Sequence, residues 1–85
     1  MKNIAEKVEK AVKNFNSRNS PFSMAEIIAI SDDKLKVSFL GYFLERYNRY
    51  DTFENFKAVL EEEGIKSEIE NVSDEESEAI VTFRF

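Results

Sequence analysis

The side chains best suited to bind a partner lie together in residues 39–56, which read FLGYFLERYNRYDTFENF. This stretch holds seven of the chain's eleven aromatic residues, including all three tyrosines, and two of its four arginines. Tyrosine and arginine are among the residues most enriched at binding hot spots. Residues 42–50, called the Tyr-Arg segment below, therefore predict a binding surface. Its candidate site residues are Tyr42, Arg46, Tyr47, Arg49 and Tyr50.

The Tyr-Arg segment also has a purely structural interpretation, in which its rings form a small hydrophobic core with the tyrosine hydroxyls at the rim. The sequence leaves its conformation open. As a helix, it would place Phe43, Tyr47 and Tyr50 on one stripe. As a strand, it would place Tyr42 and Arg46 on one face and Tyr47 on the other. In the functional interpretation, tyrosine rings stack on partner groups and arginine binds carboxylate or phosphate.

The chain contains no histidine and no cysteine. This removes the commonest general base, the commonest metal ligands and thiol chemistry, and it leaves serine without its usual activating base. The acidic pair Asp32–Asp33 and the acidic run 74–76 lack the spacing of a calcium loop, and the sequence has no glycine-rich phosphate loop. We therefore predict a protein that is not an enzyme and that binds no cofactor and no metal ion.

Eighty-five residues are enough for one small domain, which we expect to span residues 1–85. No stretch approaches the roughly 20 apolar residues of a membrane span, and residues 1–7 lack the apolar run of a signal peptide. We therefore expect a cytoplasmic protein without a membrane partner. The absence of Gln and Trp and the abundance of Lys and Glu favour a thermophilic source, although seven asparagines argue against it. No motif indicates a known family, and the short, acidic, histidine-free chain resembles small archaeal proteins.

Charge is distributed unevenly along the chain, whose net charge is −5. Residues 1–20 carry five basic residues against two acidic ones, and residues 61–79 carry nine acidic residues against one lysine. This asymmetry favours antiparallel or head-to-tail self-association, whereas the simpler interpretation is that both regions are solvated faces. An isoelectric point near 4.8 opposes binding to nucleic acid, because that binding depends on basic side chains that neutralise phosphates.

Two segments have the pattern of amphipathic helices. Residues 3–16 repeat apolar residues at spacings of three and four. A second helix is predicted to start at Asp51, with Glu54 three residues later, and to end at Gly64. Residues 24–31 and 35–39 predict a hairpin around a turn at Asp32–Asp33, and further strands follow at 65–72 and 79–85. A short helix is the alternative for residues 24–31, because Ser23 and Glu26 fit a capping box.

The order α-β-β-α-β-β predicts an α+β fold of two layers, in which a four-stranded antiparallel sheet carries both helices on one face. In the expected hairpin, Ile30 lies opposite Leu35 and Ile28 lies opposite Val37. The C-terminal strand is predicted to be an edge at which a partner strand can add. The sheet face without helices would carry apolar and polar residues, namely Ile27, Ala29, Lys36, Ser38, Leu40, Ile80, Thr82 and Arg84.

These features predict a small non-enzymatic protein-interaction module that self-associates, as a homodimer, or binds another protein. The predicted contacts are the outer sheet face or an edge strand, together with the Tyr-Arg segment. The alternative is an accessory RNA- or nucleotide-binding domain. In that alternative, Tyr42, Tyr47 and Tyr50 are stacking platforms, and the arginines of the segment contact phosphate.

Overall fold

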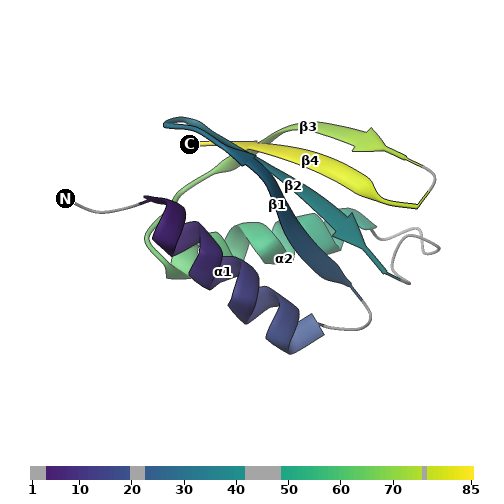
Figure 1. The fold of residues 1–85 in the computed structure, drawn as a ribbon, viewed down its shortest axis with the longest axis horizontal. Helices are drawn as coiled ribbons and strands as arrows, with labels where there is room; N and C mark the ends of the chain where they lie inside the picture. Colours follow the sequence, from purple (N-terminus) through teal and green to yellow (C-terminus); the bar gives the residue numbers. More distant parts are fainter. Residues whose placement is uncertain (1–3, 20–22, 42–48, 76) are drawn as a thin grey trace.

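The computed structural model describes residues 4–19, 23–41, 49–75 and 77–85. Within these residues the helices and strands follow the predicted order (Figure 1). The elements are α1 (Ile4–Asn19), β1 (Met24–Ile30), β2 (Lys34–Leu40), α2 (Arg49–Glu62), β3 (Glu68–Asp74) and β4 (Ala79–Arg84). Residues 24–30 form the predicted strand and not the alternative helix, because their neighbours along β2 supply a matching ladder of backbone hydrogen bonds.

The four strands form one sheet in the order β1-β2-β4-β3, and every neighbouring pair is antiparallel. Both helices lie against the same face of this sheet (Figure 1). The predicted α+β fold with two layers is therefore confirmed. The order divides the molecule into two halves of the same plan, α1-β1-β2 and α2-β3-β4, whose second strands pair at the centre of the sheet.

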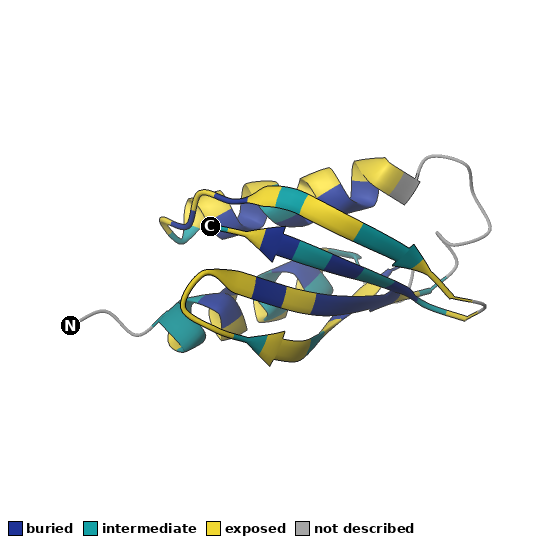
Figure 2. Cartoon of the chain, turned by 90° about the horizontal axis from the view of Figure 1, so that it is seen from above, coloured by how far each residue is buried: buried dark blue, intermediate teal, exposed yellow. Residues whose placement is uncertain are grey.

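The prediction that the C-terminal strand is an edge is wrong. β4 pairs with β2 on one side and with β3 on the other, so its backbone groups are used in both directions. The edges are β1 and β3, which are largely exposed, whereas buried residues alternate along β4 (Figure 2). A partner strand can therefore reach the sheet only at β1 or β3.

The two helices form because each has one apolar face to bury against the sheet. α2 begins at Arg49, two residues before the predicted start at Asp51, and ends at Glu62, with Gly64 as the predicted C-terminal cap. Gly64 has a φ of +86°, its N–H donates to the carbonyl of Glu61, and the N–H of Ile65 donates to the carbonyl of Leu60. This is the left-handed helix end that glycine adopts without a steric penalty. The buried apolar residues of the two helices are Val8, Ala11 and Phe15, then Phe53, Phe56, Val59 and Leu60.

The core between the layers is dominated by five phenylalanine rings, each of which is fully buried. Phe39 on β2 lies at the centre of this cluster, with ring centroids 5.2 Å from Phe53, 5.4 Å from Phe56 and 5.8 Å from Phe15. Phe83 on β4 completes the cluster. Because these rings come from both halves, the two halves share a single core.

The hairpin of β1 and β2 departs from its predicted register at one residue. Ile30 lies opposite Leu35 as predicted, but Val37 lies opposite Ile27, and the register shifts between Ile27 and Ala29. Ile28 is thus the extra residue of a β-bulge, which turns its side chain outward. The outer face therefore carries Ile28 in place of the predicted Ile27, which packs against the core instead.

Candidate functional site

The Tyr-Arg segment falls mostly outside the residues that the structure describes. Tyr42, Arg46 and Tyr47 lie outside them, and Arg49 is known only as the first residue of α2. Tyr50 is described: it lies in the first turn of α2, is 58% exposed, and places its ring 5.5 Å from that of Phe53. The segment therefore stays a prediction, supported at Tyr50 by an exposed ring in the helix layer.

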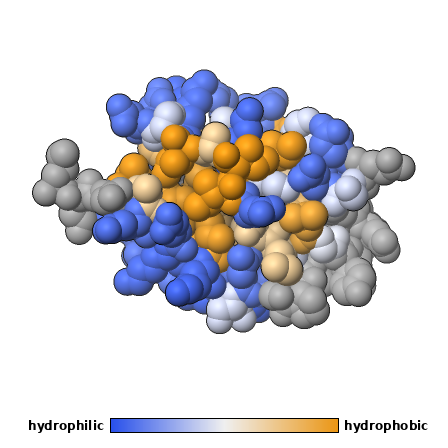
Figure 3. Space-filling view, in the orientation of Figure 1, coloured by the Kyte–Doolittle hydropathy of each residue, from blue (hydrophilic) through white to orange (hydrophobic). Residues whose placement is uncertain are grey.

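A second apolar surface lies on the outer face of the sheet, over β1 and β2. Met24 and Leu40 lie directly opposite each other and are 44% and 38% exposed, and Ile28 in the bulge is 47% exposed. Figure 3 shows the side of the molecule on which β1 lies above α1, where an apolar area along β1 has hydrophilic surface around it. We call Met24, Ile28 and Leu40 the β1-β2 patch. Beside it is a shallow hollow of about 140 Å³, lined by Ala29, Ile30, Ser31, Lys34, Lys36 and Thr82.

The other half of the outer face is covered by paired charges. Lys34 Nζ lies 3.2 Å from the Glu70 carboxylate, and the Arg84 guanidinium lies 3.9 Å from Glu70 and 4.0 Å from Glu68. These four side chains come from β2, β3 and β4 and form one network across the sheet. Exposed pairs of this kind stabilise the fold little, but they keep water at the surface and offer no apolar contact area.

The β1 edge is protected from strand addition at its first residues. The side-chain amide of Asn16, on α1, accepts a hydrogen bond from the Ala25 N–H at 2.7 Å and donates one to the Ala25 carbonyl at 3.0 Å. These are the two bonds that a neighbouring strand would make at Ala25. The β3 edge is protected differently, by the acidic residues Glu68, Glu70 and Asp74 and by a bulge of its own between Ile69 and Asn71. Edge pairing is thus disfavoured on both sides of the sheet.

The uneven charge along the chain is partly neutralised within the molecule. Arg18 on α1 lies 3.2 Å from Glu62 at the end of α2, and Lys10 lies 4.0 Å from Glu63. The basic N-terminal region and the acidic region after residue 60 therefore meet inside one chain. The charge asymmetry is therefore no evidence for self-association. Evidence for self-association must come from the outer face of the sheet.

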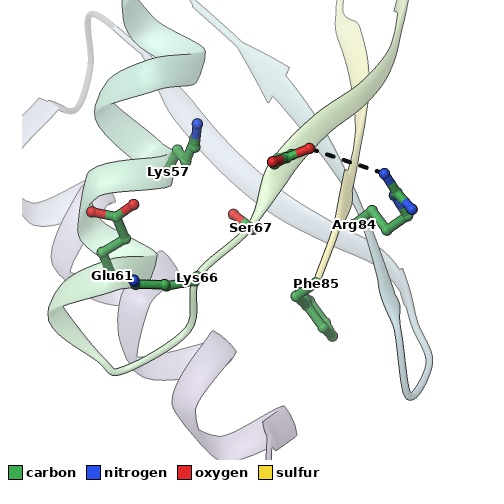
Figure 4. A pocket seen from close by; sticks show the side chains of 7 residues that line it. Lys57, Glu61, Lys66, Ser67, Arg84 and Phe85 are labelled. Atoms are coloured by element: carbon green, nitrogen blue, oxygen red, sulfur yellow. Dashed lines mark ion pairs between the residues drawn. The ribbon is translucent and has the colours of Figure 1, made fainter.

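A groove of about 470 Å³ lies between the end of α2 and the start of β3. Figure 4 shows Lys57 and Glu61 on α2, with Lys66, Ser67, Arg84 and Phe85 on the segments opposite. Two of its basic groups are already paired, Lys57 with Glu54 at 3.9 Å and Arg84 with the acids of β3. Its positive and negative side chains are nearly balanced, so the groove selects no class of ligand.

The described residues show neither a metal site nor a membrane-spanning helix. No group of three or more acidic side chains in the described part of the chain is arranged to hold a metal ion. No helix among residues 4–19 and 49–62 is long and apolar enough to cross a membrane. The described aromatic residues also leave the outer sheet face without a stacking platform, because Phe15, Phe39, Phe53, Phe56 and Phe83 are buried, Phe85 packs against the core and Tyr50 belongs to α2.

Comparison with known proteins gives a likeness of fold. No family model and no curated protein matches the sequence. The structure is similar to the crystal structure of the periplasmic domain of XcpY, with a TM-score of 0.60 and 16% sequence identity, over 95% of this chain and 92% of that one. At this identity the likeness shows the fold: this chain has the αββαββ architecture of that domain.

The same comparison corrects the prediction of a cytoplasmic protein. That prediction was a default drawn from the composition of residues 1–7, whereas the solved domain of the same fold is periplasmic. The composition of a few N-terminal residues is a poor guide to compartment, because domains of this fold also occur outside the cytoplasm. The predicted thermophilic source and the predicted homodimer stay predictions.

Proposed function

We propose that this domain is a non-enzymatic protein-interaction module that self-associates through the β1-β2 patch. The main evidence is a difference between the two halves of the outer face. Three exposed apolar side chains lie on β1 and β2, whereas an ion-pair network covers the β3-β4 side. Water is released from an apolar patch when a second apolar surface covers it, at about 25 cal/mol per Å². Interaction patches have this apolar centre and polar rim.

The similar fold of the periplasmic domain of XcpY is compatible with this role. The protection of both sheet edges against strand addition also favours the β1-β2 patch as the contact surface. Asn16 occupies the backbone groups of Ala25 on β1, and charges line β3, so a partner gains more from the patch than from either edge. The Tyr-Arg segment, of which Tyr50 is described and exposed, is the alternative contact.

The test is the molar mass of the protein in solution, measured by light scattering across a dilution series. We expect a dimer that dissociates on dilution, and we expect Ile28→Glu to make the protein monomeric at every concentration while its circular dichroism stays unchanged. Ile28 is exposed, so the glutamate disturbs no core contact.

The matched variant is Tyr50→Glu, which introduces the same charge at the other large exposed apolar side chain. Retention of the dimer in Tyr50→Glu and its loss in Ile28→Glu support the β1-β2 patch. The reverse result would assign self-association to the Tyr-Arg segment. A wild-type protein that is monomeric at every concentration would refute self-association altogether.

A further inference from the structure

Two unpaired charges of opposite sign flank the bulge on the outer face. Glu26 on β1 lies opposite Ser38, and Lys36 on β2 lies opposite Ala29, next to Ile28. Both charged side chains are exposed, and within the described residues neither makes an ion pair or a side-chain hydrogen bond. The outward charges of β3 and β4, by contrast, pair with one another.

The register places these residues at the corners of a small rectangle. Glu26 and Lys36 occupy one diagonal, and Ala29 and Ser38 occupy the other, with Ile28 beside Ala29 in the bulge. Ser38 is buried, and its hydroxyl donates a hydrogen bond to the Glu78 carboxylate. Neighbouring strands are about 4.8 Å apart and residues of one face about 6.6 Å apart along a strand, so the two charges are separated by only one strand and one step of the pleat.

A two-fold axis along the diagonal from Ala29 to Ser38, in the plane between two sheets packed face to face, brings each of the other two corners to about 2–3 Å from the position of the other. Each Glu26 then lies near the Lys36 of the second molecule, twice by symmetry, and Ile28, beside Ala29, lies near its own copy. A two-fold contact is isologous: it uses one surface on both molecules and requires that surface to be complementary to itself.

We infer that the occupant of the β1-β2 patch is a second copy of this chain, docked about this axis with reciprocal Glu26–Lys36 ion pairs. The inference rests on the proposed self-association and specifies its geometry. Any partner that covers Ile28 removes water from both charges, and a buried charge without a partner is strongly unfavourable. A second copy supplies the opposite charge at both corners, whereas an unrelated protein would need to match both of them independently.

The area of the sheet face indicates how tightly two copies can bind each other. Strands of seven residues span about 23 Å, and four strands spaced by about 4.8 Å give a whole face on the order of 400 Å² per copy, of which the β1-β2 half docks. This is below the roughly 800 Å² per partner of a standard interface, so we expect a weak dimer with a dissociation constant in the micromolar range. The ion pairs serve mainly to fix the register.

The decisive experiment is a charge exchange measured by sedimentation equilibrium. Glu26→Lys and Lys36→Glu each turn both pairs into like-charge contacts, and each is expected to weaken the dimer about tenfold or more. The double variant restores both pairs in reversed order and should return the dissociation constant to within about threefold of wild type. An equimolar mixture of the two single variants should form a heterodimer that is tighter than either homodimer, because every contact between the unlike chains is again complementary.

The controls are Glu9→Lys and Lys13→Glu, which make the same charge changes at exposed positions on α1, away from the sheet face. They should leave the dissociation constant unchanged. A dimer that Ile28→Glu disrupts but that shows neither rescue in the double variant nor tightening in the mixture would overturn the two-fold register and leave the proposed function standing. A wild-type monomer would overturn both.

Discussion

The two αββ halves of this molecule follow the same plan, yet they present different outer surfaces. In each half an edge strand with a bulge pairs with a central strand. The bulge residue of β1 is Ile28, which is exposed, whereas the bulge residue of β3 is Glu70, which pairs with Lys34 and Arg84. The fold thus determines which positions face outward, and the residue types at those positions determine which half can dock.

On the inner side the two halves are not separate. Phe39 on β2 contacts Phe15 of its own half and the rings of Phe53, Phe56 and Phe83 in the other half. The two halves share one core on the inner face of the sheet, but they carry different residues on its outer face. Residues on the outer face can therefore change with little effect on the core. The following experiments test this separation.

Phe39→Ala is expected to have the largest effect. Removing this fully buried ring leaves a cavity among four other rings and should lower the free energy of unfolding by about 3–5 kcal/mol. Because the core is shared, amide hydrogen exchange should lose protection equally in β2 and in β4. Urea unfolding and hydrogen exchange give the two readings, with the exposed Tyr50→Ala as the comparison variant. Loss of protection in α1, β1 and β2 alone would show that the halves fold independently.

Asn16→Ala tests whether the Asn16 side chain protects the β1 edge from strand addition. The substitution removes both side-chain bonds to Ala25 and should cost about 1–2 kcal/mol of unfolding free energy. It also frees the Ala25 backbone for strand addition, so we expect oligomers larger than a dimer in light scattering at high concentration. Asn14→Ala makes the same change two residues earlier on α1, where no side-chain hydrogen bond is made among the described residues, and should do neither. If the two variants have the same stability and the same oligomeric state, Asn16 does not protect the β1 edge.

The sequence was informative where burial follows directly from pattern. The alternation from Leu35 to Phe39 predicted β2 and its inner face, because each second residue of a half-buried strand is apolar. The bulge at Ile28 was not predictable in this way, because Ile27, Ile28 and Ile30 are equally apolar and fit two registers. It arises from constraints that are distant in sequence.

Two of those constraints are visible in the structure. At one end, the turn pairs Ile30 with Leu35, and at the other end Ala25, held by Asn16, pairs with Phe39. Four residues of β1 then face three of β2, so one must bulge. The strand order was also not predictable, because β2 and β4 pair residues that are 40 to 50 positions apart in the sequence, and no local pattern indicates such a contact. The β1-β2 patch depends on both features, because the bulge exposes Ile28 and the strand order places β1 beside β2 at one side of the sheet.

The smallest effect on stability and the sharpest test of the comparison come from Glu70→Ile. This variant gives β3 the residue type that β1 carries in its own bulge. The ion pairs it removes are exposed, so the free energy of unfolding should change by less than about 1 kcal/mol.

Its effect on association should be larger. An apolar side chain at residue 70 extends the β1-β2 patch over the second half of the face, and the dimer should tighten or give way to higher oligomers in sedimentation. Glu54→Ile, which removes a charge from the ion pair with Lys57 on α2, is the control and should leave association unchanged. If both variants associate equally, exposed apolar area anywhere on the molecule suffices, and the difference between the two halves of the sheet does not determine docking.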